Sequence, residues 1–213
     1  MRTPTGTVEL DADFTAPAPG YGTVIFAHGS GSGRRSPRNR QVAHALQDRG
    51  LGTLLLDLLA QPEVHTDELT AEYRFNIPLL TGRLLAATDW LVEQPEARKL
   101  PIGYFGASTG GAVAMWAAAR RPEAVWAIVL RGARSDLGDD AAAQIRCPTL
   151  LIVGGRDPGI RALNEQTLRL LSCPKNLVVV PGASHLFEEK GALETVADHT
   201  LVWFARYLIP PPT

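Results

Sequence analysis

Short apolar runs alternate along the chain with longer amphipathic stretches. Six of these runs are rich in Val, Ile and Leu and show no regular alternation with polar residues, which is typical of strands buried on both faces. They cover residues 23–27, 51–57, 102–105, 125–130, 149–153 and 176–180. An earlier segment, residues 7–10, does alternate, and we expect it to form an edge strand.

The stretches between these runs carry helical signals. Ser36 and Pro37 indicate an N-cap followed by the first helical residue, and the helix that they open is expected to end at Gly50. Further helices are predicted from Asn76 to the residue before Pro95, and over residues 110–121, 163–171 and 193–208. Because strands and helices alternate throughout, the predicted fold class is α/β: one domain over residues 1–213, with a mostly parallel sheet and helices on both faces.

The composition narrows the class of protein. The chain has 213 residues, 45% of them hydrophobic, and a formal net charge of −1, which argues against disorder and is ordinary for a soluble globular protein. With 21 basic and 22 acidic residues it has no overall positive field, so we expect no nucleic-acid partner. Residues 1–14 lack an apolar signal-peptide core, and no run reaches the roughly 20 apolar residues of a membrane helix. We therefore expect a cytoplasmic protein without a membrane partner.

Two cysteines, Cys147 and Cys173, are too few for a disulfide scaffold. Each precedes a proline and a predicted strand, which leaves a single buried bridge open. Two buried and unreactive thiols are the favoured interpretation.

The strongest local signal for chemistry is the sequence Gly-Ala-Ser-Thr-Gly at residues 106–110, which matches G-x-S-x-G. It follows a predicted buried strand and precedes a helix rich in small residues, which is the context of a nucleophile elbow. Glycines two residues on either side of Ser108 remove β-carbons that would clash at such a sharp turn. Ser108 is therefore the candidate nucleophile.

A serine hydroxyl is a poor nucleophile at neutral pH and needs a general base. The less suitable histidines are His44 and His199, in predicted amphipathic helices, His65, in a polar loop, and His28, which ends the first buried strand. His185 follows the last predicted strand, at the sheet edge where catalytic groups gather in α/β proteins. We therefore predict that His185 is the base.

The base needs a carboxylate that fixes its tautomer. Asp157 follows the predicted strand at 149–153, whereas Asp136, Asp139 and Asp140 lie in a polar stretch after the preceding strand. Choosing Asp157 gives the chain order serine, aspartate, histidine, which is that of α/β-hydrolases. The competing interpretation of Asp157 is an Asx-turn residue before a proline.

A developing oxyanion needs preorganised donors. We expect one to be the backbone N–H of Thr109, the residue after the candidate nucleophile. The other is expected to be the N–H of Ser30, in the glycine-rich loop after the first buried strand. A competing interpretation of this loop is a phosphate cradle, but residues 28–33 lack the P-loop lysine and do not match G-x-G-x-x-G.

Four features together resemble the α/β-hydrolase superfamily over nearly the whole chain: the elbow at 106–110, the loop that begins at His28-Gly29, Asp157 and His185. The segments 28–40 and 182–188 are most similar to the dienelactone hydrolase-like group and its small carboxylesterases. The resemblance implies a hydrolase with a Ser or Cys, His and Asp triad and with no metal or other cofactor. Dienelactone hydrolases are known for a cysteine nucleophile where this chain has Ser108, so a general serine esterase is the better inference.

Arginines flank the predicted site. Four follow the oxyanion loop and two follow the strand that ends at residue 130: Arg34, Arg35, Arg38, Arg40, Arg131 and Arg134. Positive charge at a helix start opposes the helix dipole, so the first cluster does not serve helix stability. A solvated surface is the favoured interpretation. The competing one is binding of an anionic substrate group, with Arg131 as the first candidate and Arg34 as the second.

We expect a serine hydrolase of the carboxylesterase type that cleaves small, short-acyl esters through an acyl-enzyme intermediate. Acyl transfer and peroxide-dependent chemistry would use the same residues, and a non-catalytic binding scaffold is the alternative from another class. The segment 131–148, where this superfamily usually inserts a lid, is long enough only for a turn and a short helix. We therefore expect no cap domain.

Overall fold

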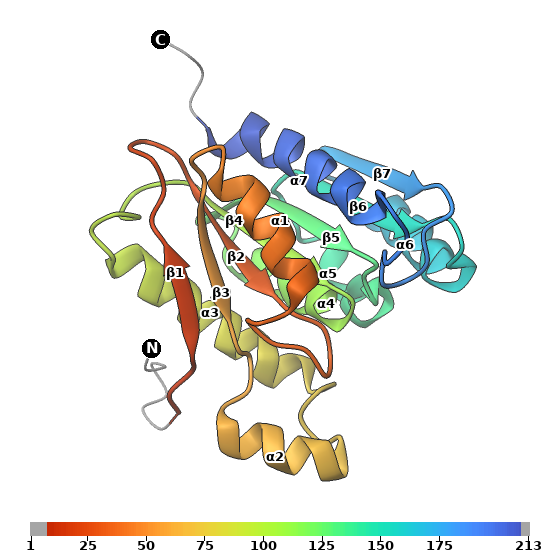
Figure 1. The fold of residues 1–213 in the computed structure, drawn as a ribbon, viewed down its shortest axis with the longest axis horizontal. Helices are drawn as coiled ribbons and strands as arrows, with labels where there is room; N and C mark the ends of the chain where they lie inside the picture. The colour runs from red at the N-terminus through yellow and green to blue at the C-terminus, as the bar shows by residue number, and fades with distance from the viewer. Residues whose placement is uncertain (1–7, 210–213) are drawn as a thin grey trace.

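The computed structural model describes residues 8–209. Its strands form one sheet in the order β1-β3-β2-β4-β5-β6-β7, and every neighbouring pair is parallel except β1 with β3 (Figure 1). The strands are β1 (Ala12–Thr15), β2 (Thr23–Ala27), β3 (Gly52–Leu56), β4 (Ile102–Ala107), β5 (Val125–Arg131), β6 (Thr149–Gly154) and β7 (Lys175–Val180). This is the expected α/β architecture.

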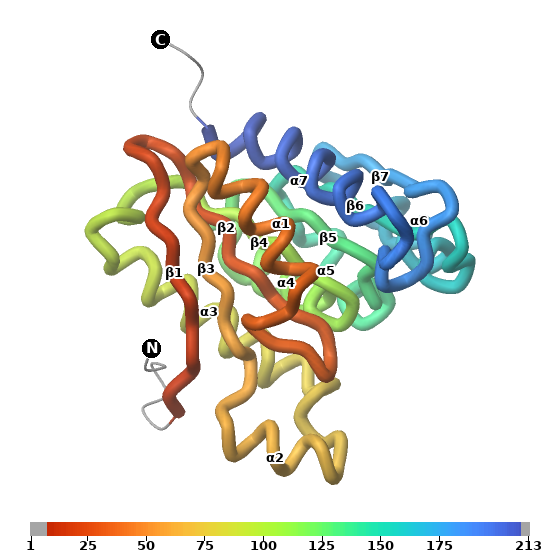
Figure 2. Tube along the Cα trace, viewed as in Figure 1, coloured from red at the N-terminus to blue at the C-terminus, as the bar shows by residue number. Residues whose placement is uncertain are grey.

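Helices cover both faces of the sheet (Figures 1 and 2). One face carries α1 (Pro37–Gln47) and α7 (Ala192–Leu208), which pack against each other. The other carries α3 (Ile77–Glu93), α4 (Thr109–Arg120), the turn η1 (Ser135–Gly138), α5 (Asp139–Ala142) and α6 (Pro158–Leu170). A further helix, α2 (Gln61–Thr70), projects from the end of β3. Among residues 8–209, no helix combines the length and the apolar character that crossing a bilayer requires.

Successive side chains of the central strands enter two separate apolar clusters. In β4, for example, Tyr104 belongs to the cluster under α3 and α4, and Phe105 belongs to the cluster under α1 and α7. Both side chains are fully buried. Because each face of the sheet is covered, the strands need apolar residues at every position, which explains the continuous runs in the sequence.

The six predicted strands are confirmed, with ends that differ by two residues at most. However, β7 lies at the edge of the sheet and is mostly exposed or half-buried, so it is not buried on both faces as expected. Four of the helices also match closely, but α6 begins at Pro158, five residues before the predicted start at 163. The reason is an N-cap: the side chain of Asp157 accepts a hydrogen bond from the Ile160 N–H at 3.3 Å. The Asp157-Pro158 pair was therefore also a helix-start signal.

Two expectations about local structure are wrong. The edge strand is β1 at Ala12–Thr15, not residues 7–10, and Thr7 lies outside the described residues. His65 lies in α2 rather than in a loop. This helix has a weak apolar stripe and is held by Glu63 instead, whose carboxylate accepts from the Ala60 N–H at 2.8 Å and pairs with Arg83 at 2.7 Å.

The two cysteines are free thiols, so the bridge that the sequence left open is not formed. Cys147 is buried and Cys173 is half-buried. Burial raises the pKa of the Cys147 thiol to about 12, which makes it a poor nucleophile.

Candidate active site

Ser108 occupies a sharp turn between β4 and α4, with φ of 51° and ψ of −121°. A positive φ is costly for a residue with a β-carbon and persists only where neighbouring contacts impose it. Here the Ser108 N–H donates to the Arg131 carbonyl at 3.0 Å, and the Arg134 N–H donates to the Ser108 carbonyl at 3.1 Å. The end of β5 therefore holds the turn that presents the Ser108 side chain.

Two glycines allow backbone to pass close to this turn. A β-carbon on Gly110 would lie 2.1 Å from the Ala27 carbonyl oxygen, so no side chain fits between α4 and the end of β2. A β-carbon on Gly29 would lie 3.1 Å from the Ser108 β-carbon. The loop after β2 thus lies directly against the elbow.

The structure brings Ser108, His185 and Asp157 together although they are far apart in the sequence. The His185 Nε2 atom lies 3.3 Å from the Ser108 Oγ, and the His185 Nδ1 lies 2.8 Å from the Asp157 Oδ2. Each residue follows the carboxyl end of a different strand, namely β4, β6 and β7. With Asp157 ionised, His185 donates from Nδ1 and keeps Nε2 free to accept the serine proton.

The competing carboxylates lie elsewhere. Asp136 forms a double hydrogen bond with the Arg134 guanidinium, at 2.9 and 2.8 Å, and this pairing lowers the pKa of Asp136. Asp139 accepts from the Thr167 hydroxyl at 2.5 Å. Asp157 is the carboxylate bonded to His185, and its second oxygen caps α6. The same carboxylate therefore bonds the histidine and caps a helix.

The backbone amides of Ser30 and Thr109 are available as donors. Within residues 8–209, neither amide donates to another group of the protein. Thr109 is the first residue of α4, where backbone N–H groups lack intrahelical acceptors and carry the positive end of the helix dipole. Ser30 follows Gly29, which lies against the Ser108 side chain. Thr109 therefore adjoins Ser108 in the chain, and Ser30 adjoins the residue that packs against Ser108.

His28 fixes the loop that carries Ser30. Its Nε2 accepts from the Leu58 N–H and its Nδ1 bonds the Gly29 carbonyl oxygen, both at 2.9 Å. These two bonds require the neutral ring with the proton on Nδ1. Burial lowers the pKa of His28, which favours the same neutral form, although the bond to Gly29 and the charge of Asp57 oppose the shift.

Arg131, at the end of β5, is buried and lines a cleft of about 210 Å³ together with Ser108, His185 and Arg38. Its Nε and Nη1 atoms are buried without a hydrogen-bond partner, and no carboxylate of the described chain pairs with it. Its guanidinium carbon lies 5.9 Å from the centre of the Phe187 ring. Burial, together with the charge of Arg38, lowers the pKa of Arg131 to about 10, which leaves the group a cation at neutral pH.

Arg34, the second arginine candidate, does not line this cleft. Its guanidinium pairs with Asp57 at 2.5 Å and lies 3.4 and 3.5 Å from carboxylate oxygens of Asp11 and Asp13. Its backbone N–H also donates to Asp57 at 2.6 Å. Arg34 therefore ties the loop after β2 to the acidic residues around β1 and β3, and these contacts give no support to the competing interpretation of Arg34 as an anion-binding residue.

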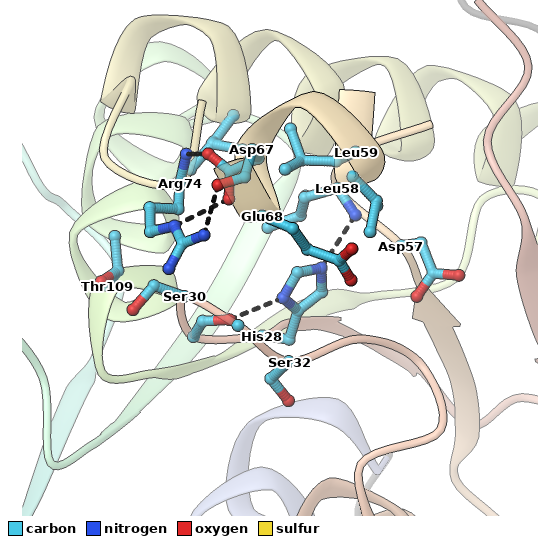
Figure 3. A pocket seen from close by; sticks show the side chains of 14 residues that line it. His28, Ser30, Ser32, Asp57, Leu58, Leu59, Asp67, Glu68, Arg74 and Thr109 are labelled. Carbon is cyan, nitrogen blue, oxygen red and sulfur yellow. Dashed lines mark hydrogen bonds and ion pairs between the residues drawn. The ribbon is translucent and has the colours of Figure 1, made fainter. Parts of the chain in front are cut away.

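A second hollow, of about 150 Å³, is also lined by the loop that carries Ser30 and lies beneath α2 (Figure 3). Its apolar walls are Leu58, Leu59, Val64 and Leu80. At its rim, Asp67 accepts from the Arg74 guanidinium and from two backbone amides, each at 2.8 Å. Burial alone would raise the pKa of Asp67, but these hydrogen bonds and the Arg74 charge lower it.

Neither this hollow nor the place of Arg38 in the site was predicted from the sequence. The only signals for α2 were the proline and Glu63 near its start, because its apolar spacing is poor. Arg38 stood among four similar arginines, and nothing local distinguished it from the others. Within residues 8–209, no three His, Cys, Asp or Glu side chains gather in a way that could hold a metal ion.

This chain is similar to curated sequences and to solved structures of other proteins. The Mycobacterium tuberculosis protein named "Putative phosphoribosyl transferase Rv0571c" is 47% identical over 206 residues, which are 97% of this chain and 46% of that protein. The chain thus spans about half the length of this curated relative. A dienelactone hydrolase from Anabaena variabilis superimposes with a TM-score of 0.94 at 52% identity, over 97% of this chain and 95% of that one. Est1E from Butyrivibrio proteoclasticus shares the fold, with a TM-score of 0.78 at 16% identity over 92% and 93% of the two chains.

The model of the dienelactone hydrolase family matches residues 38–206. This range includes the elbow, the residue after the nucleophile, Asp157 and His185. It leaves out β1, β2, the loop with Ser30 and the last residues of the chain. The fold, the elbow and this match lead to one conclusion: the chain belongs to the dienelactone hydrolase family.

Proposed function

We propose that the protein is a serine carboxylesterase acting through an acyl-enzyme. Ser108 Oγ attacks the ester carbonyl while His185 Nε2 takes the hydroxyl proton. His185 then gives this proton to the leaving alcohol, and Asp157 stabilises the imidazolium through Nδ1. Water, activated by the same histidine, releases the acyl group and restores Ser108.

The Ser30 and Thr109 amides complete the proposal as the oxyanion hole. Charge develops on the carbonyl oxygen in the transition state, and preorganised N–H groups stabilise it without having to reorient. The observation that carries the proposal is the unbroken path from Asp157 through His185 to Ser108, beside two amides with no acceptor of their own among residues 8–209.

Other uses of the site differ in the group that attacks the acyl-enzyme. Acyl transfer and perhydrolysis require an alcohol or hydrogen peroxide to outcompete water, and no observation in the cleft favours either. A binding scaffold would not need the strained φ of Ser108 or the aligned histidine. The phosphoribosyl transferase name belongs to a longer relative, and this chain spans only about half of that protein.

A fluorophosphonate probe tests this proposal, because it forms a stable adduct only with an activated serine. We expect mass spectrometry to place one adduct on Ser108, with loss of hydrolysis of short p-nitrophenyl esters. Ser108→Ala should abolish labelling and hydrolysis, whereas Ser172→Ala, at an exposed serine outside the cleft, should change neither. Labelling elsewhere, or hydrolysis that survives Ser108→Ala, would refute the serine mechanism.

A further inference from the structure

Two hollows of different character meet at the loop that carries Ser30. Both are lined by Gly29, Ser30 and Ser32. The cleft adds Ser108, His185, Arg38 and Arg131. The hollow beneath α2 adds three leucines, one valine, three acidic residues, Arg74 and Thr109. A substrate carbonyl at the oxyanion donors would therefore have one hollow on each side.

We propose that the substrate is an ester of an apolar acyl group with an anionic alcohol, whose carboxylate or phosphate binds Arg131 and Arg38 in the cleft. The apolar acyl group enters the hollow beneath α2. The proposal rests on the esterase function above and adds the class of substrate and its orientation.

The state of Arg131 supports an anion site. An arginine that is only 7% exposed normally has a carboxylate partner, because an unpaired buried charge is costly. Arg131 has two buried nitrogens without acceptors among residues 8–209, and its side chain lines the cleft. Its contact with the Phe187 ring offsets only part of this cost. An oxyanion bound in the cleft would supply the negative partner that this guanidinium lacks among the described residues.

Arg38 adds a second cation to the same cleft. Its Nε is also buried without an acceptor among residues 8–209, while its Nη1 is 3.3 Å from the exposed carboxylate of Glu188. Two like charges in one cleft repel each other, as the effect of Arg38 on the pKa of Arg131 shows. A bound anion would remove this repulsion. The pair therefore stabilises an anionic ligand beyond what either arginine does alone.

The reaction itself decides which part of the ester lies in which hollow. When Ser108 Oγ bonds the acyl carbon, the bond from that carbon to the alcohol oxygen breaks, and His185 Nε2 returns the serine proton to that oxygen. The alcohol must therefore lie on the side of His185, and His185 lines only the cleft with the arginines. The acyl group then points to the opposite side, beneath α2.

The charges around the second hollow agree with this orientation. Asp57, Asp67 and Glu68 line the hollow. Asp57 is paired with Arg34 and Asp67 with Arg74, whereas Glu68 has no cationic partner among residues 8–209 and would repel an anion placed there. Arg74, the cation at its rim, is already bonded to Asp67 (Figure 3). The leucine walls suit an uncharged hydrocarbon chain, and each buried methylene contributes about 0.8 kcal/mol.

Matched esters distinguish the two sides. One pair carries the same butyryl group on 4-hydroxybenzoate, an anionic alcohol, or on 4-hydroxybenzamide, its neutral analogue. We expect Arg131→Met to lower kcat/KM for the benzoate ester at least tenfold more than for the benzamide ester. Arg169→Met, at an exposed arginine in α6, should leave the ratio unchanged. A further ester, 4-butyryloxyphenyl phosphate, shows whether phosphate can replace carboxylate. A last ester, 4-nitrophenyl succinate, carries the anion on the acyl group, where we expect no benefit from Arg131.

Two readouts separate ligand binding from a structural role. Because the alcohol has left before deacylation, Arg131→Met should slow the acylation burst with the benzoate ester and leave the hydrolysis rate of the butyryl-enzyme unchanged. Because it removes an unpaired buried charge, the same substitution should leave Tm unchanged or raise it. Should Arg131→Met fail to fold, Arg38→Met provides the same kinetic comparison.

Three results for Arg131→Met would overturn the proposal: equal losses of kcat/KM on the two butyryl esters, slower deacylation of the butyryl-enzyme, or a larger loss on the succinate ester than on the benzoate ester. Failure of the esterase function is recognised separately, because Ser108 would then not be labelled by the fluorophosphonate. If Ser108 is labelled but Arg131→Met does not discriminate between the matched esters, only the anion-site proposal is refuted.

Discussion

Asp157 bonds His185 through one carboxylate oxygen and caps α6 through the other. The helix after β6 therefore positions the carboxylate that orients the histidine. Asp157→Asn keeps a capping side chain but presents an amide to Nδ1, which favours the wrong tautomer of His185. We expect kcat for a short ester to fall by about 10⁴-fold with little change in Tm.

Asp136→Asn is the matched control for this prediction. Asp136 pairs with Arg134 and does not contact His185, so its replacement should cost less than about tenfold in kcat. Steady-state kinetics of both variants, with Tm as a check on folding, ranks them. If Asp136→Asn were the more damaging change, the acid would have to be reassigned to the end of β5.

The second prediction concerns the close approach of α4 to the end of β2. A β-carbon at Gly110 would lie 2.1 Å from one carbonyl oxygen and 2.5 Å from the next, both of them backbone. Gly110→Ala should therefore destabilise the protein by about 4 kcal/mol or more, because neither backbone can move without disturbing the sheet. Gly82→Ala, at an exposed helical glycine with no neighbour within 4 Å, should stabilise it by about 0.5–1 kcal/mol. Urea unfolding measures both, and similar values for the two variants would contradict the packing argument.

Local signals predicted those parts of the molecule that local interactions build. The elbow around Ser108 combines a buried strand, two glycines and a small-residue helix within a short segment, so its geometry was predictable from sequence. The sequence ranked Arg131 ahead of Arg34 but could not show their partners: the strand order places three aspartates around Arg34 and none beside Arg131 among the described residues. The hollow beneath α2 was missed because the pair of Glu63 with Arg83 that anchors the helix joins residues 20 positions apart.

The third prediction is a pH dependence of stability that His28 causes. Burial lowers the pKa of His28 below its ordinary value of 6.5, so the unfolded chain takes up a proton at higher pH than the folded one. Between those two pKa values the unfolded state binds more protons, and stability rises with pH. The stability contributed by neutral His28 is therefore complete above about pH 6.5 and is lost as the pH falls below it.

His28→Gln tests this contribution because the glutamine amide oxygen can accept from the Leu58 N–H without titrating. We expect the wild type to lose more Tm than His28→Gln between about pH 7.5 and about pH 5. His199→Gln, on α7 and away from the site, is the control. An equal loss of Tm in the wild type and His28→Gln would show that His28 does not set the acid limit.

The last prediction concerns the length of the acyl group. The segment between β5 and β6 forms only the η1 turn and the short α5, so α2 is the element that roofs a hollow beside the oxyanion donors. A hollow of about 150 Å³ limits how many methylenes are buried, and we expect acyl groups of about two to six carbons to be hydrolysed best.

Val64→Phe fills the hollow from α2 and should shift the preference from butyryl towards acetyl. Losing the burial of two methylenes corresponds to about 1.6 kcal/mol, or a change of about fifteenfold in the ratio of kcat/KM values. Leu69→Phe, on the same helix but 78% exposed, should leave this ratio unchanged. A kcat/KM that rises steadily to long acyl chains, with a jump when the substrate forms an emulsion, would show instead that α2 moves as a lid and that the hollow does not limit chain length.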